Sequence, residues 1–77
     1  MATETYKEWI VRKYLGQDNP RGDLAYDVKH DAAFPGRLEN RDVILDHLNA
    51  KGACKECVAL FGRTWEVYCK ETGYQET

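Results

Sequence analysis

The apolar residues in the C-terminal third of the chain recur with the spacing of an α-helix. They step by four, three, four and three positions, at Cys54, Val58, Phe61, Trp65 and Tyr68. A stripe of this kind runs along one side of an amphipathic helix and must be buried against other elements. The pattern therefore predicts one long helix, and the rest of the chain has to supply the other side of its core.

The N-terminal segment carries the signals of a first, shorter helix. Thr5 and Glu8 have the spacing of a capping box, in which each side chain bonds the backbone of the other. The apolar stripe that follows steps by four residues, at Tyr6, Ile10 and Tyr14, and Gly16 is suited to end the helix.

A second helix is predicted to begin at Pro20, because proline is favoured in the first helical turn, with Asn19 or Asp18 as the cap. Residues 21–23 read Arg-Gly-Asp, an adhesion tripeptide when it stands on an exposed, extended loop. Here the tripeptide falls within the first predicted helical turn, which favours a structural interpretation.

Three aspartates, Asp23, Asp27 and Asp31, follow at four-residue spacing. Calcium loops instead use closely spaced ligands around a tight turn, so helical spacing does not wrap an ion. We interpret the aspartates as a solvated acidic face. Phe34 and the Pro35-Gly36 pair should end this unit, with Phe34 folding back onto the core.

A third helix is predicted from about Asn40 to Ala50, closed by Lys51 and Gly52, with Val43, Ile44, His47 and Leu48 on one side. The chain should thus form a single all-α domain with a core at about residues 5–70 and a flexible tail at 73–77. The predicted core comprises Trp9, Ile10, Tyr14, Leu24, Val28, Phe34, Ile44, Leu48, Val58, Phe61, Trp65 and Tyr68.

Composition limits the classes of function. A length of 77 residues allows one small domain, and a net charge of -2 lacks the basic surplus of most nucleic-acid-binding proteins. No apolar run approaches the ~20 residues of a membrane span. The segment MATETYKEW has neither the basic region nor the apolar region of a signal peptide, so we do not expect it to be one. Three cysteines form no disulfide framework, so we expect a reducing, cytoplasmic location.

The Cys54-x-x-Cys57 pair allows three interpretations. It could be half of a zinc site completed by Cys69 with His47 or His30, although a second ligand pair is missing. It could be a redox pair at a helix N-terminus, although no βαβ pattern surrounds it. We favour simple packing, with Cys54 on the apolar seam and Cys57 and Cys69 nearer its edge.

The sequence has no arrangement of residues that is typical of a catalytic site. It contains no serine, no glycine-rich phosphate loop and no metalloprotease motif. We therefore expect a protein that is not an enzyme and that needs no cofactor or metal.

Basic residues gather around the third predicted helix and on the fourth, where acidic residues interrupt them. They are the candidate partner-binding residues: Arg37, Arg41, Lys51, Lys55 and Arg63.

Four segments of the sequence, taken in order, resemble a known family. The segments are YKEWIVRKY, DNPRGDLAYDVKHDAAFP, VILDHLNAKGAC and FGRTWEVY. Together they resemble the YozE SAM-like family of small proteins, found mainly in Firmicutes and their phages, over about residues 6–68. The resemblance implies a compact four-helix SAM-like bundle, in which Gly22, Asp23, Leu24 and Phe34 match as determinants of the fold. It supplies no catalytic residues and no established activity.

Sterile alpha motif domains in general mediate protein association, and some bind RNA. By this analogy of fold we expect a small interaction or regulatory module that binds a protein partner. The alternative is a domain that binds DNA or RNA.

Overall fold

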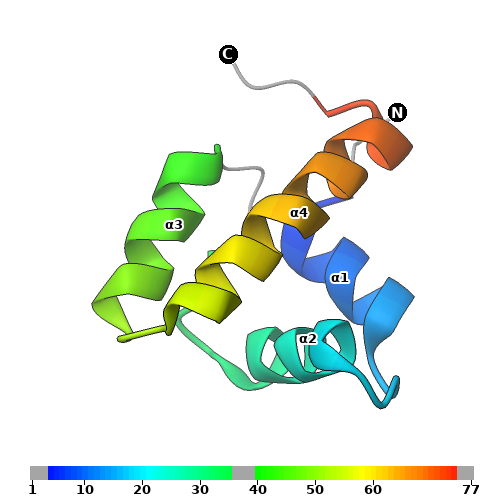
Figure 1. Ribbon diagram of the computed structural model, residues 1–77. Coiled ribbons are helices and arrows are strands. Elements are labelled where there is room, and N and C mark those ends of the chain that lie inside the picture. Colours follow the sequence, from blue (N-terminus) through cyan, green and yellow to red (C-terminus); the bar gives the residue numbers. More distant parts are fainter. Residues whose placement is uncertain (1–3, 36–39, 75–77) are drawn as a thin grey trace.

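The computed structural model describes residues 4–35 and 40–74. These residues form four α-helices, α1 (Tyr6–Tyr14), α2 (Pro20–His30), α3 (Arg41–Ala50) and α4 (Lys55–Thr72), and contain no strand (Figure 1). The predicted all-α architecture is confirmed. Within the described ranges, no helix is both long enough and apolar enough to cross a membrane.

The first two helices begin at the predicted caps. At α1, the Thr5 hydroxyl accepts a hydrogen bond from the Glu8 backbone N–H at 3.2 Å, and the Glu8 carboxylate accepts one from the Thr5 N–H at 3.2 Å. At α2, the Asn19 side chain accepts from the Gly22 N–H at 2.9 Å, with Pro20 in the first turn. The Arg-Gly-Asp tripeptide lies within that turn, as predicted.

Gly22 is buried where the connection from α1 meets α2. A Cβ atom at this position would lie 1.9 Å from the carbonyl oxygen of Gln17 and 2.7 Å from its carbonyl carbon. Since the obstacle is backbone, only glycine allows the loop to close against α2 in this way. Gly62 in α4 differs, because a Cβ there would meet nothing within 4 Å.

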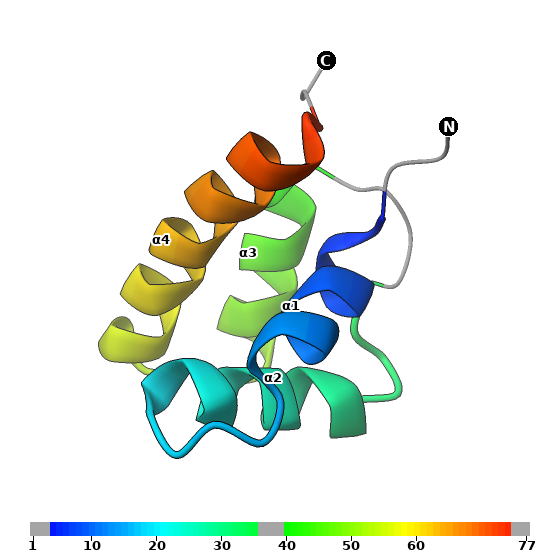
Figure 2. The same cartoon turned by 90° about the vertical axis from the view of Figure 1, so that its right-hand side faces the viewer.

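The longest helix, α4, packs against each of the other three, and α1 also packs against α2. In both views α2 lies across the end of the bundle where α3 stops and α4 begins (Figures 1 and 2). The fold thereby brings the second half of α2 close to the α3–α4 turn, although these segments are separated by some twenty residues in the sequence.

The core is built around Tyr6, which was not among the predicted core residues. Its ring lies 5.2–6.3 Å from five other aromatic rings, and its hydroxyl is hydrogen-bonded to the buried Thr64 hydroxyl at 2.7 Å. Burial raises the pKa of Tyr6, against the effect of the Thr64 hydrogen bond. The buried apolar residues are Tyr6, Trp9, Ile10, Leu24, Ala25, Val28, Phe34, Ile44, Leu48, Phe61, Trp65 and Tyr68.

Ten of the predicted core positions are therefore confirmed, Phe34 among them, whereas Tyr14 and Val58 are only half-buried. Val43, which was grouped with Ile44, His47 and Leu48 on one side of the third helix, is 40% exposed. Only Ile44 and Leu48 are buried in α3, so its buried face is narrow and Val43 lies outside it.

Part of the predicted flexible tail packs onto the bundle. Tyr74 is half-buried, with its ring 5.8 Å from the Trp65 ring and 5.7 Å from the Tyr68 ring. Residues 75–77 lie outside the described part of the chain.

Candidate partner-binding groove

A groove of about 510 Å³ lies between α2 and the α3–α4 turn. Its apolar lining residues are Leu24, Val28, Phe34, Leu48 and Ala53, and its polar ones are Asp27, His30, Asp31, Lys51, Cys54 and Cys57. The volume lies within the range of pockets that bind ligands. We refer to this feature as the α2 groove.

Asp31 joins the two sides of the α2 groove. It is the C-cap of α2, and its carboxylate forms a hydrogen bond with His47 Nε2 at 2.7 Å and an ion pair with Lys51 Nζ at 3.4 Å. The hydrogen bond to His47 is the main cause of a lowered pKa at Asp31, and the Ala33 N–H and Lys51 add to it. Asp31 is half-buried, so its assignment to a solvated acidic face is wrong.

The reason is the position of Asp31 at the helix end. Since α2 stops at His30, Asp31 leaves the helical stripe and turns toward α3. His47 is half-buried, and its ring lies 5.5 Å from that of Phe34.

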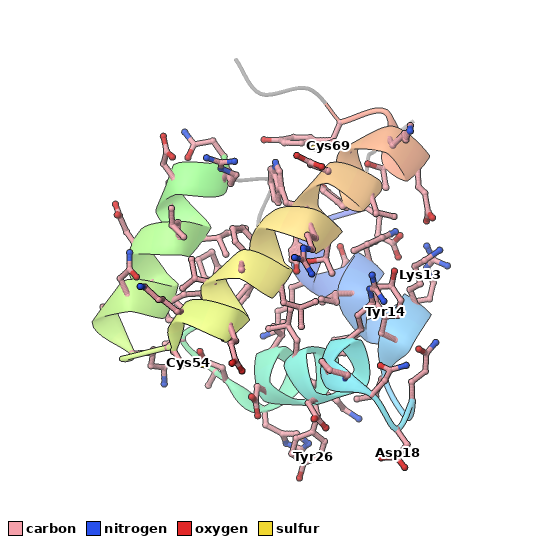
Figure 3. The ribbon with its side chains drawn as sticks, in the orientation of Figure 1. Lys13, Tyr14, Asp18, Tyr26, Cys54 and Cys69 are labelled. Carbon is pink, nitrogen blue, oxygen red and sulfur yellow. The ribbon has the colours of Figure 1, made fainter. Side chains whose placement is uncertain are left out.

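The solvent-facing side of α2 carries exposed polar and aromatic side chains, of which Asp27 and His30 also line the α2 groove. Asp23 and Asp27 are exposed, in agreement with the predicted acidic face. Tyr26 is 58% exposed and projects away from the bundle, with its ring 4.3 Å from that of His30 (Figure 3). In the part of the chain that the structure describes, Asp27 forms no salt bridge.

The cysteines are placed differently from the prediction. Cys54 is exposed rather than part of the seam, because α4 starts at Lys55 and leaves Cys54 as the N-cap. Cys57 is half-buried in the first turn, and Cys69 is half-buried toward the far end of α4 (Figure 3). Burial raises the pKa of the Cys57 thiol, and Cys54 and Asp27 act in the same direction.

The residues of the alternative zinc site, Cys54, Cys57 and Cys69 with His47 or His30, are not assembled into a metal-binding group. Among residues 4–35 and 40–74, no three His, Cys, Asp or Glu side chains are grouped so that they could hold a metal ion.

The predicted basic residues are distributed over several surfaces. Lys51 lines the α2 groove, whereas Arg63 lines a second, smaller hollow of about 360 Å³ that also includes Glu56. Arg41 and Lys55 are exposed at the first positions of α3 and α4. Arg37 lies outside the described residues.

Sequence reasoning missed the α2 groove itself. Its walls come from residues 24–34 and 48–57, and no periodic pattern within one segment reveals that two segments meet. Tyr26, a large aromatic residue outside the apolar stripe of α2, marks an exposed position on that helix but does not line the groove, so it gave no signal for it.

Comparison with known proteins identifies the family. A search of curated proteins and a search of solved structures each give no match. The profile of one protein family, described as the YozE SAM-like fold, matches residues 5–70. Because this match spans most of the chain and the structure is a four-helix bundle, the protein belongs to the YozE SAM-like fold family.

Proposed function

We propose that the protein is a non-enzymatic interaction module that binds a protein partner through the α2 groove. The observation that carries this proposal is a groove with apolar lining residues and with Asp27, an exposed aspartate that forms no salt bridge within residues 4–35 and 40–74. Apolar depressions with a few polar groups at the edge are typical of recognition sites.

The apolar lining defines one part of the partner. Leu24, Val28 and Leu48 line the α2 groove, although each belongs to the buried core. A large side chain from a partner segment would bury its surface there, at roughly 1.5–3 kcal/mol for a Leu- or Phe-sized group.

The charged residues of the α2 groove define the second feature of the partner. Asp31 and Lys51 neutralise one another, whereas Asp27 is exposed and forms no salt bridge with the residues that the structure describes. A partner segment with Lys or Arg beside its apolar anchor would pair with Asp27. We therefore propose a basic amphipathic segment, such as one face of a helix, as the occupant.

The experiment compares two charge reversals on exposed helical positions. Asp27→Lys places a cation at the α2 groove, and Glu66→Lys makes the same change on the exposed side of α4, away from it. Bead-immobilised protein of each kind captures partners from a bacterial lysate, and a basic amphipathic peptide from any captured protein is then titrated directly. We expect Asp27→Lys to weaken binding by at least about tenfold, because like charges meet, and Glu66→Lys to leave it unchanged.

A second variant tests the apolar part. Ala53→Phe fills space in the α2 groove and should also abolish capture, while far-UV circular dichroism verifies that the variant is folded. Capture that is equal for all variants, or the absence of any partner at high protein concentration, refutes the proposal.

Nucleic-acid binding is the alternative, and the placement of the basic residues gives it less support. Phosphate contacts need several cations on one face, whereas Lys51 is paired with Asp31 and Arg63 shares its hollow with Glu56. Fluorescence anisotropy with labelled DNA and RNA at low salt tests it. Affinity that falls steeply with salt concentration would establish this alternative.

A further inference from the structure

Cys54 and Cys57 occupy the N-cap and third positions of α4, and both line the α2 groove. We propose that they form a thiol–disulfide exchange pair, in which exposed Cys54 attacks a low-molecular-weight disulfide and Cys57 then resolves the mixed disulfide. This proposal does not depend on a protein partner.

The first support is the geometry of the N-cap. The backbone of Cys54, with φ -73° and ψ 164°, closely matches that of Thr5 (-71°, 158°) and Asn40 (-79°, 166°). In both of those caps, the side chain contacts the third helical residue. Thr5 Oγ1 lies 2.9 Å from the Glu8 carboxylate, and the Asn40 side chain accepts a hydrogen bond from the Val43 N–H at 3.0 Å. The same backbone allows the Cys54 thiol to turn toward Cys57.

The spacing is also suited to a disulfide. Residues three apart in a helical turn have Cα atoms about 5 Å apart, which is within the range that a disulfide bridges. Cys54 makes no side-chain capping hydrogen bond, so no capping bond has to break when the new bond forms.

The two thiols differ as the two roles require. Cys54 is exposed, so a disulfide in solution can reach its thiol. Cys57 is half-buried in the same groove, and burial raises the pKa of its thiol. The accessible thiol therefore meets the external disulfide first, and the less accessible thiol is placed to resolve the mixed disulfide.

The exchange balances in two steps. The Cys54 thiolate attacks one sulfur of glutathione disulfide, forms a mixed disulfide and releases one glutathione thiolate. Cys57 then loses its proton to solvent, attacks the Cys54 sulfur and releases the second glutathione thiolate. Two protein thiols are oxidised to one disulfide, and one glutathione disulfide is reduced to two thiols.

Cys69 is the internal control thiol for the proposed exchange reaction. It stands twelve residues beyond Cys57 on the same helix, a separation of about 18 Å along the axis. Figure 3 shows Cys54 and Cys69 toward opposite ends of α4. Cys69 is therefore outside disulfide distance of the pair and should remain titratable after the pair is oxidised.

The test incubates the full chain with excess glutathione disulfide, quenches with acid, alkylates and measures the intact mass. We expect the loss of two hydrogens and a single alkyl group, on Cys69, with full reversal by dithiothreitol. Lys55 separates the two cysteines, so a tryptic digest locates the bond as a link between residues 52–55 and 56–63.

Three variants separate the roles. Cys57→Ser should accumulate one glutathione on Cys54, several-fold faster than on Cys69. Cys54→Ser should lose the rapid reaction, and Cys69→Ser should form the disulfide as the unaltered chain does. Separate glutathione adducts on Cys54 and Cys57 without a bond between them would overturn the proposal, as would a Cys54 thiol that reacts no faster than Cys69.

Discussion

Replacement of Gly22 by alanine tests the tightest backbone contact in the structure. Helix propensity alone predicts that Gly→Ala inside a helix stabilises it by up to about 1 kcal/mol. The structure predicts the opposite sign, because the new Cβ would lie 1.9 Å from the Gln17 carbonyl oxygen, whereas real contacts stay beyond 3.0 Å. The connection or the start of α2 would have to move by about 1 Å.

The magnitude follows from the kind of obstacle. Overpacking typically costs about 1–3 kcal/mol, and we expect the upper end, because a backbone carbonyl has no alternative rotamer. After the gain in propensity, the free energy of unfolding should fall by about 2 kcal/mol. For a domain of this size that corresponds to a decrease in Tm of about 8–16 °C.

Gly62→Ala is the matched control, since a Cβ there meets nothing within 4 Å and only the propensity gain should remain. Urea denaturation followed by far-UV circular dichroism measures both variants, and a thermal scan gives their Tm values. A Gly22→Ala protein that is as stable as the unaltered chain would refute the close approach at Gln17.

Two further predictions concern polar contacts. The lowered pKa of Asp31 means that its pairing with His47 contributes stability above the ordinary carboxyl pKa of 3.8, and that this contribution is lost as the pH falls through the depressed value. The urea midpoint of the unaltered protein should therefore fall between about pH 5 and pH 2. Over the same range it should fall less in Asp31→Asn, and identical acid profiles for the two proteins would contradict the pairing. Tyr6→Phe removes the bond to Thr64 but keeps the ring, and Thr64 still donates to the Phe61 carbonyl at 2.9 Å, so equilibrium unfolding should show a loss of only about 1 kcal/mol. A loss as large as the ~3–5 kcal/mol of a deleted aromatic ring would mean that the hydroxyl pair organises the core.

Local signals in the sequence were sufficient for the helices. The capping box at Thr5, the proline at position 20 and the stripe on α4 act between residues a few positions apart, so their consequences are visible without the fold. The family resemblance agreed with the same four segments, and the match over residues 5–70 confirms it.

Two of the errors fall at the ends of helices. Cys54 continued the apolar period but lies one residue before α4, and Asp31 continued the acidic period but lies one residue after α2. Beyond a helix end the side chain no longer follows the helical direction, so periodicity stops predicting which way it faces.

The sequence by itself determined that this chain forms four helices with apolar faces, because capping, propensity and periodicity are local properties. Only the tertiary structure decided that Tyr6 lies at the centre of the core, that Gly22 admits the Gln17 carbonyl, and that α2 and the α3–α4 turn enclose a groove. These features depend on contacts between residues far apart in the chain, and such contacts follow from how the helices pack rather than from any one segment.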